Sequence, residues 1–507
     1  MKKSLFTMMA TALVFSNVVG CSSSAKTQPD AANNGAGGDG NEKIAINMMT
    51  YSVDGGGWPD NAEIVQELNK KLNIDLKIQW VPNDNYDNKL ETLAAANNMP
   101  DLYTIRDIKR YLSWQQKGIL MDVKPSLNQY PNLVKYLGED GFKILNPKDK
   151  YYGLPYYVPE TRDSLAIRQD WLDKLNLKMP TTIDEFYSVA KAFATQDPDG
   201  NGKQDTVGFS FAVNPQTGVF ERLAFLQGAF GLANGWKEEN GKLIPYQTQV
   251  SELKDMVAFL QKAYNEGVLD KDFAVNKLRD PLNKFEASKV GTGYVNPNEV
   301  YSSTIPSVTK VDPKAKVVQL LPPKGPKGQA TLTGTGGTQK VVINGKIDPK
   351  KQQRILKLLD YMMSDEGTDL IKNGIEGVDY KKVDGNKYEK LDFDKNRPQI
   401  LSLWFLRRYD PLIQVFKFSD PQLAQNLSVW AENNAKYAWK NPGAGLVSDT
   451  NVKIGASLDQ KLAQALVKAI IDKESVDTID KAVADWKSGG GDKIIKEIND
   501  AYAASKQ

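Results

Sequence analysis

The chain has 507 residues, 41% hydrophobic and 25% charged, an ordinary globular composition that is sufficient for two or three packed cores. It contains no histidine and one cysteine, which excludes Ser-His-Asp triads, HExxH zinc sites and disulfides within the chain. The 65 Lys and Arg against 62 Asp and Glu give a net charge of +3. This balance is untypical of nucleic-acid-binding proteins, which concentrate basic charge to neutralise phosphates. Small neutral partners are the default expectation.

The N-terminus has the pattern of an export signal. Two lysines precede an apolar stretch at 5–15, and small residues lead to Cys21, where a bacterial lipoprotein signal places the residue that is lipidated. We expect 1–20 to be a signal peptide and Cys21 to anchor the protein to the extracellular face of the cell membrane. The alternative is an ordinary secretory peptide with a chance cysteine. Residues 21–43 form a flexible tether with a reach of about 25 Å.

The first part of the mature chain alternates strands and helices. Apolar runs predict strands at 44–49, 74–80 and 101–105, with helices near 64–72 and 86–97 between them. This alternation is typical of a parallel sheet covered by helices.

The loops after these strands are candidates for ligand binding. They lie at 54–60, 82–85 and 106–107, and in an open α/β sheet such loops share the edge at which ligands bind. The segment 151–159, with four tyrosines and two prolines around one glycine, is interpreted as a crossover to a second α/β lobe.

The second lobe is predicted to begin near residue 160. A strand is expected at 165–168, followed by a helix that starts with the capping box at 182–185. Further strands are expected at 290–295, 317–321 and 340–343, and helices over 350–373 and much of 420–507.

Motifs along the whole mature chain resemble one protein family. They are the lipoprotein signal, MPDL at 99–102, YGLP at 152–155, IRQDWLDKL at 167–175, DPDGNG at 197–202, and WK at 486–487 with GGGDKII at 489–495 and EIN at 497–499. In order and spacing the chain resembles the extracellular solute-binding proteins (family 1) of ABC sugar importers. The most similar group is the large oligosaccharide-binding lipoproteins of Gram-positive bacteria, which also resemble alginate-binding proteins.

The resemblance implies an α/β fold with two lobes, a periplasmic-binding-protein-like (type II) clamshell with hinge crossovers that closes on a sugar. It also implies the division of the chain. The N-terminal lobe would comprise 44–158 and 331–375, the C-terminal lobe 159–322 and 376–507, and the hinges would lie near 155–160 and 322–336.

A second motif has the spacing of a calcium loop. Oxygen-bearing side chains stand at positions 1, 3, 5 and 9 of an EF-hand-type loop, with glycine at position 6 and a backbone carbonyl expected at position 7. The predicted calcium ligands are Asp197, Asp199, Asn201, Lys203 and Asp205. Gly208 replaces the usual glutamate at position 12, so Thr206 or water would complete the shell. The alternative is a solvated Asx/Gly turn.

Sugar-binding candidates are aromatic and planar polar residues in loops, because C–H faces of sugars stack on flat rings and hydroxyls need polar partners. The candidates are Trp58, Asp60, Arg106, Tyr156, Tyr157, Arg162, Trp236, Tyr294, Asn296, Trp404 and Arg407. Each aromatic side chain has the alternative of packing in a core, which we assign to Trp171 and Trp486. For each arginine, including Arg168, the alternative is a salt bridge.

We therefore expect a membrane-anchored, monomeric substrate-binding component of an ABC transporter that delivers an oligosaccharide to a permease. It would have structural calcium, no catalytic residues and no nucleic-acid partner. The alternatives are a surface-anchored polysaccharide-processing enzyme, since paired carboxylates cleave glycosides without histidine, and a carbohydrate sensor or adhesin.

Overall fold

The structure is a computed structural model of the chain. It describes residues 42–52, 61–146, 150–156, 164–214, 218–332, 339–385, 387–396, 408, 410, 412–413, 415–472 and 474–506. The expected signal peptide, Cys21 and nearly all of the tether lie outside these residues. Across the described ranges, no helix is both long enough and apolar enough to span a bilayer.

The first sheet has the strand order β2-β1-β3-β13-β4. Its strands are β1 (Ile44–Ser52), β2 (Ile74–Pro82), β3 (Leu102–Ile105), β4 (Leu154–Pro155) and β13 (Lys340–Ile343). The associated helices are α1 (Glu63–Leu72), α2 (Tyr86–Ala95), α3 (Ile108–Gln116), α4 (Pro131–Lys143), α12 (Pro349–Met363) and α13 (Asp365–Asn373), with the 3₁₀ segments η1 (Asn83–Asn85) and η2 (Lys124–Gln129). The strands and helices expected before residue 106 are therefore confirmed.

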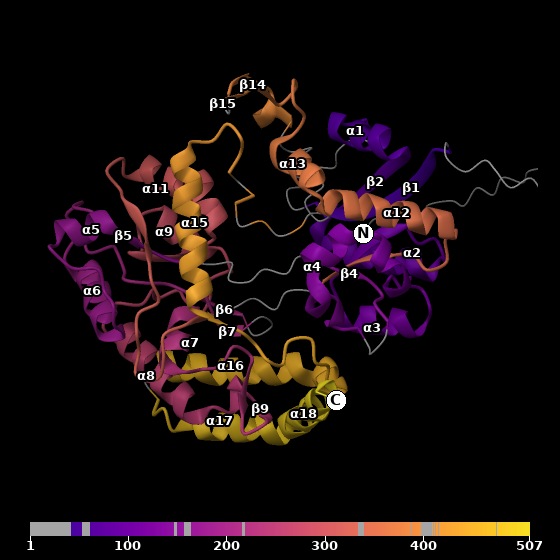
Figure 1. Ribbon diagram of the computed structural model, residues 1–507. Helices are drawn as coiled ribbons and strands as arrows, with labels where there is room; N and C mark the ends of the chain where they lie inside the picture. The colour runs from indigo at the N-terminus through magenta and orange to yellow at the C-terminus, as the bar shows by residue number, and fades with distance from the viewer. Residues whose placement is uncertain are drawn as a thin grey trace, which may run out of the picture. The chain divides into compact units, whose positions relative to one another are not determined.

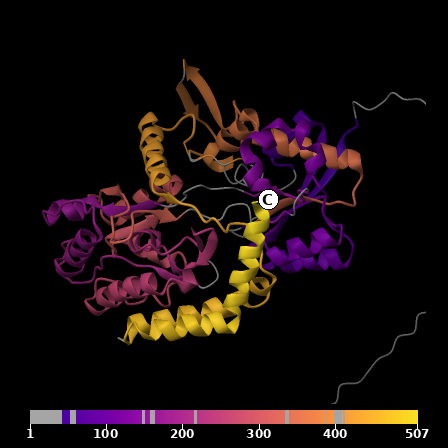
Figure 2. The same ribbon diagram turned by 60° about the horizontal axis from the view of Figure 1, so that its bottom comes forward.

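The sheet is mixed. β1 pairs in parallel with β2 and β3, as the alternation of elements predicts. β13 pairs antiparallel with β3 and with β4, so the chain returns to this sheet after more than 170 residues. Both views show orange α12, which directly follows β13, against the indigo strands (Figures 1 and 2).

The second sheet has the order β10-β5-β11, and all its pairs are antiparallel. The strands are β5 (Ser164–Arg168), β10 (Thr292–Val295) and β11 (Val317–Leu320). The helices are α5 (Gln169–Lys174), α6 (Ile183–Thr195), α7 (Ala224–Phe230), α8 (Val250–Asn265), α9 (Asp280–Glu286), α10 (Pro297–Glu299), α11 (Ile305–Val311), α15 (Pro421–Lys436), α16 (Ala456–Ile471), α17 (Thr478–Trp486) and α18 (Asp492–Ser505). The capping box of α6 is formed, with Thr182 Oγ1 accepting from the Glu185 amide and the Glu185 carboxylate accepting from Thr182 N–H.

The remaining elements are short. Two-stranded pairs are β6 (Ala212–Asn214) with β7 (Gly218–Glu221), β8 (Trp236–Glu239) with β9 (Lys242–Pro245), β12 (Thr331–Leu332) with β16 (Ala438–Trp439), and β14 (Tyr380–Asp384) with β15 (Lys387–Lys390). Single turns are η3 (Tyr246–Thr248), η4 (Val300–Thr304), η6 (Asn451–Gly455) and η7 (Lys487–Gly491).

The apolar core is divided between the two sheets. Ile46 and Met48 of β1 face one buried cluster, and Met49 faces another on the opposite side of the first sheet. Both faces of a parallel strand are expected to be covered in this way. Residues of the second sheet share one buried cluster with α6, α8 and the C-terminal helices, and α16 and α17 lie beside α8 (Figure 1). Trp171 and Trp486 are buried in this second core, as expected.

One segment packs differently from the expected division of lobes. Phe393 belongs to the core of the first sheet, and Phe416 and Phe418 pack against it, although these residues follow 375, where we expected the chain to enter the second lobe. Trp430 of α15 is the first residue after them that lies in a core cluster of the second sheet. The cause is an aromatic cluster in which Phe393 contacts both other phenylalanines.

Candidate functional site

The first sheet presents the carboxyl ends of its parallel strands at one edge. Tyr51 of β1 is paired with Val81 of β2, one residue before both strands end, and Arg106 directly follows β3. The loop at 82–85 and Arg106 are therefore brought together, as the sequence predicts for two of the three loops. The third, 54–60, lies outside the described residues.

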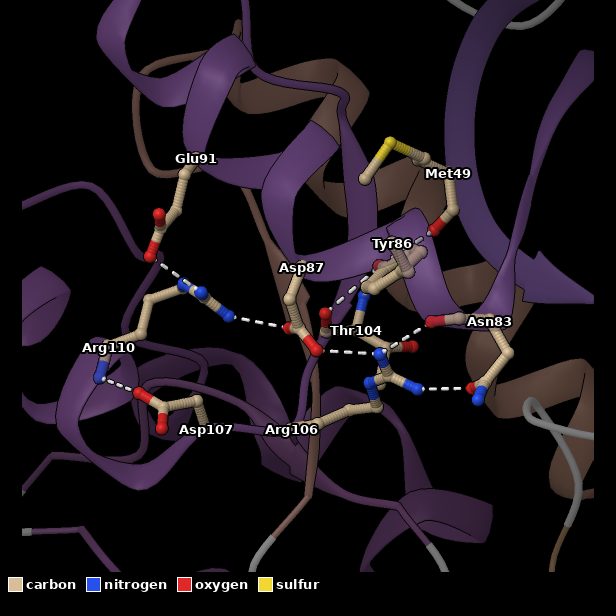
Figure 3. A network of polar contacts seen from close by, with 9 residues as sticks. All are labelled: Met49, Asn83, Tyr86, Asp87, Glu91, Thr104, Arg106, Asp107 and Arg110. Carbon is tan, nitrogen blue, oxygen red and sulfur yellow. Dashed lines mark hydrogen bonds and ion pairs between the residues drawn. The ribbon is translucent and has the colours of Figure 1, made fainter.

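Tyr86, the first residue of α2, connects two strands beneath this edge. Its fully buried hydroxyl has one proton, which is shared between the carbonyl oxygens of Thr104 (3.0 Å) and Met49 (3.3 Å), and it accepts from Thr104 N–H at 3.0 Å (Figure 3). Burial raises the pKa of the Tyr86 phenol well above its usual range. The hydroxyl therefore stays protonated and holds β1 and β3 together.

Arg106 lies between the strand ends and α2. Its guanidinium donates to Asn83 Oδ1 (2.5 Å) and to the Asn83 carbonyl (3.2 Å), and it pairs with Asp87 at 2.6 Å (Figure 3). Its Cζ is 4.7 Å from the ring centroid of Tyr51 and 5.1 Å from that of Tyr86. The side chain is 19% exposed. Arg106, a predicted ligand residue, thus stands at the expected edge with its charge compensated.

A second arginine completes this network. Arg110 of α3 pairs with the other oxygen of Asp87 at 2.6 Å and with Glu91 at 2.7 Å (Figure 3). Burial disfavours its charge, but the hydrogen bonds to Glu91 and Asp87 outweigh burial and raise its pKa. Helix α3 begins here because the Asp107 carboxylate accepts from the Arg110 amide at 2.7 Å. The two guanidinium groups are thus matched by the carboxylates of Asp87 and Glu91.

The other described candidates lie elsewhere. Tyr156 packs partly buried against the core of the first sheet. Trp236 begins β8 instead of lying in a loop; its ring packs against the second core and covers Gly443, where an added Cβ would approach it to 2.6 Å. Tyr294 lies in β10, its hydroxyl 3.2 Å from that of Thr331. The partly exposed Asn296 follows β10.

Several predicted residues lie outside the described parts of the chain. They are Trp58, Asp60, Tyr157, Arg162, Trp404 and Arg407. For Arg168 the salt-bridge alternative is correct. It is fully buried and pairs with Asp170 (2.6 Å) and Asp312 (2.7 Å).

A cavity of about 710 Å³ lies away from these candidates. Its lining includes Gln115, Asn146, Tyr152 and Glu497. Of the predicted ligand residues that the structure describes, none lines this cavity. The cavity therefore gives no support to the predicted ligand set.

The predicted calcium loop follows the C-terminus of α6, and Gln204 donates to the Thr195 carbonyl at that helix end (3.2 Å). The Asp197 carboxylate accepts from the amides of Asn201 (3.1 Å) and Gly202 (3.0 Å). Gly202, at position 6, has φ +79°, which glycine adopts without strain. The backbone thus turns as the spacing predicts.

The side-chain amide of Asn201 lies among the carboxylates of the loop. Its Nδ2 donates to Asp199 (2.7 Å) and to Asp205 (3.0 Å), and Lys289 pairs with Asp205 at 2.6 Å. Burial and the neighbouring carboxylates of Asp197 and Asp205 raise the pKa of Asp199. In the part of the chain that the structure describes, no group of three or more acidic or cysteine side chains is arranged to hold a metal ion. The donor types suit calcium, and the Asn201 amide would have to rotate to present its oxygen.

The structure explains the departure at position 12. A Cβ on Gly208 would approach Ala190 of α6 to 2.5 Å, so a glutamate cannot be placed there. Thr206, expected as a possible replacement ligand, is buried and donates to the Phe193 carbonyl at 2.7 Å. That expectation is wrong for the Thr206 hydroxyl, because the segment packs closely on α6 and the hydroxyl is hydrogen-bonded to that helix.

Sequence reasoning missed Tyr51, Asn83 and Asp87. Tyr51 lies two residues beyond the apolar run, where the strand was expected to end at 49. The extra length of β1 places this ring at the carboxyl edge of the first sheet. Asn83 was available from the loop prediction, but nothing in the local pattern indicates that Asp87 pairs with Arg106.

Comparisons with known proteins agree with this fold. The family model described as "Bacterial extracellular solute-binding protein" matches residues 59–369. The chain is 30% identical to the polygalacturonan/rhamnogalacturonan-binding protein YtcQ of Bacillus subtilis over 95% of each chain, and 30% identical to Lipoprotein LipO of the same organism over 98% of each.

Solved structures share the fold. One is the ABC-transporter substrate-binding protein FusA of S. pneumoniae, as an EF-hand mutant in complex with fructo-nystose, with a TM-score of 0.68 and 19% identity over 91% of this chain and 99% of that chain. The fold is thus the two-lobed α/β fold of solute-binding proteins. Because the family model matches more than half of the chain and two relatives at 30% identity match nearly all of it, the protein belongs to the bacterial extracellular solute-binding protein family.

Proposed function

We propose that this protein is the substrate-binding component of an ABC importer, which captures an oligosaccharide between its two lobes and delivers it to a permease without converting it. The observation that carries the proposal is 30% identity along 95% of both chains to a protein named for binding polygalacturonan and rhamnogalacturonan. The structural relative named as an ABC-transporter substrate-binding protein supports the same reading.

The ligand would be bound between a first lobe around the mixed sheet and a second lobe around the antiparallel sheet. We propose hinges near 155–160 and 322–336. The first lobe would comprise 44–158 and 331 to about 418, because Phe393, Phe416 and Phe418 pack with the first core. The remainder of the mature chain, 159–322 and from about 419 onward, would form the second lobe.

The protein would act as a lipid-anchored monomer at the extracellular face of the membrane. The cysteine at position 21, after an apolar export segment, supports the anchor, as does the relative named Lipoprotein LipO. Cys21→Ala should abolish incorporation of a radioactive fatty acid and release the protein from membranes with unchanged sugar affinity. Membrane retention of this variant would contradict the anchor.

We also propose that the loop 197–205 binds calcium as a structural element. Three carboxylates and an asparagine within nine residues supply the hard oxygen ligands that calcium requires. A relative of the same fold is described as an EF-hand mutant, which supports the assignment. The ion would neutralise charges that repel one another and would stabilise the segment after α6.

The function is tested by thermal denaturation with tetragalacturonate, kestose, raffinose and stachyose. A sugar that binds only the folded protein adds about 2.7 kcal/mol of stability at 100 times its Kd, so the melting temperature should rise with at least one of them. Chromatography of the recovered sugar should find it intact. Shortened products would favour the polysaccharide-processing enzyme, and a melting temperature unchanged by every sugar would contradict oligosaccharide binding.

A further inference from the structure

We propose that Tyr51 is a stacking platform for a sugar ring of the ligand, held in position by Arg106 and Asp87. This inference rests on the proposed function and adds a binding residue and its chemistry. Tyr51 is the penultimate residue of β1 at the carboxyl edge of the first sheet, and its side chain is partly exposed. A rigid aromatic face at such an edge suits the C–H face of a sugar.

Two neighbouring side chains hold the Tyr51 ring in its orientation. Arg106 lies over the ring with its Cζ 4.7 Å from the centroid, and the Tyr86 ring meets it edge to face at 5.5 Å and 73°. Tyr86 is in turn hydrogen-bonded to β1 and β3 through Met49 and Thr104. A ring held by a cation and a second ring loses little conformational freedom when a ligand binds.

Asp87 is the positioning residue for this arrangement. Its two carboxylate oxygens pair with Arg106 and Arg110, each at 2.6 Å. Arg106 also donates to the side chain and the backbone of Asn83. These contacts engage both terminal nitrogens of Arg106, and its Nε is buried, so we expect the guanidinium to support the Tyr51 ring and not to bind a ligand carboxylate.

Salt dependence distinguishes stacking of a sugar on Tyr51 from binding of a charged sugar by Arg106. Contact of a sugar C–H face with an aromatic ring depends weakly on ionic strength, whereas an arginine–uronate pair weakens as salt screens it. The contribution of Tyr51 should therefore be similar for the neutral kestose and the anionic tetragalacturonate, and similar at 20 mM and 500 mM NaCl.

The direct test compares Tyr51→Ala, Tyr51→Leu and Tyr51→Phe by isothermal titration with kestose and tetragalacturonate. Alanine and leucine should raise the Kd on the order of tenfold, because both remove the flat face, while phenylalanine should retain affinity within about twofold. Leucine keeps apolar bulk, so it serves if the alanine variant does not fold. Tyr361→Ala is the matched control. Tyr361 of α12 also has a cation over its ring, Lys71 at 5.7 Å. Lys71 stands at the end of α1, just before β2 begins, so this tyrosine lies away from the carboxyl ends of the strands.

A second variant tests the role of Arg106. Asp87→Asn should weaken binding of both sugars alike, because Arg106 loses its partner and the Tyr51 ring its support. Tighter binding of tetragalacturonate alone, with a steeper salt dependence, would instead make Arg106 a carboxylate ligand and overturn the proposal. Unchanged affinity of Tyr51→Ala and Tyr51→Leu in a protein whose wild type binds sugar would overturn it while leaving the proposed function intact. A wild type that binds no sugar would overturn both.

Discussion

The buried guanidinium of Arg168 has several hydrogen-bond and ion-pair partners at once. Arg168 has no exposed surface and is matched by Asp170 and Asp312, with the Ser288 hydroxyl accepting a further hydrogen bond at 2.7 Å and the Trp171 ring 4.7 Å away. Full burial of a guanidinium is tolerated only with such compensation. This cluster connects β5 with the segments before β10 and β11.

Glu497 of α18 offers a test at the residue scale. Its carboxylate accepts hydrogen bonds from Ser448 Oγ (2.6 Å), Thr450 N–H (2.9 Å) and Thr450 Oγ1 (2.7 Å), and these bonds lower its pKa to about 2. Since the folded-state pKa lies below the unfolded value of about 4.3, the carboxylate stabilises the protein above pH 4.3, and this stability is lost as pH falls toward 2.

Glu497→Gln should therefore lower the free energy of unfolding by about 1–2 kcal/mol at pH 7, measured by urea denaturation. The difference from the wild type should shrink between pH 4.3 and pH 2. Glu139→Gln is the control, because Glu139 of α4 is 70% exposed and pairs with Lys143 in the next turn. A pH-independent difference would assign the effect of Glu497→Gln to packing.

At the scale of elements, the loop after α6 joins one helix to a more distant part of the second core. Val207 and Phe209, just beyond it, form single bridges with Val290 and Leu269. The loop therefore connects α6 to segments about 60 and 80 residues further along the chain. Repulsion among the carboxylates of this loop would therefore weaken these longer-range contacts as well as the local turn.

Removal of calcium with a chelator should lower the melting temperature of the wild type. We expect a Kd of about 10⁻⁵ to 10⁻³ M, because the position-12 glutamate is missing, and poor replacement by magnesium, which demands a tighter octahedron. Asp199→Asn should reproduce the chelator's effect and make the protein insensitive to it. Asp500→Asn, which changes an exposed carboxylate of α18 paired with Lys496, is the control and should respond to the chelator like the wild type. An identical wild-type melting curve with and without chelator would reduce the loop to an Asx/Gly turn.

At the scale of the whole molecule, the proposed mechanism requires the lobes to close on the ligand. The segment 155–160 contains two prolines, and the segment 322–336 combines proline and glycine, so we expect the change in φ and ψ to be concentrated in these two short stretches. Small-angle scattering should give a smaller radius of gyration with a binding sugar than without it, and a sugar that fails to raise the melting temperature is the control. A tight ligand that changes neither the radius nor the tryptophan emission would contradict closure.

The sequence by itself determined the elements with strong local patterns. The strands before residue 106, the capping box of α6 and the burial of Trp171 and Trp486 follow from apolar spacing and from side chains three residues apart. Such features depend on residues within one or two helical turns of each other, and these residues are close together in the sequence. The motifs that carry the family resemblance are local in the same sense.

Only the tertiary structure decided the contacts between distant segments. It placed β13 antiparallel beside β3, engaged Thr206 with Phe193, brought Phe393 into the first core and neutralised Arg106 with Asp87. Sequence spacing places Arg106 at the carboxyl edge of the first sheet, but it does not reveal that a carboxylate of α2 pairs with its guanidinium. The physical reason is that pairing and packing between distant segments depend on how whole faces fit together, which no local pattern records.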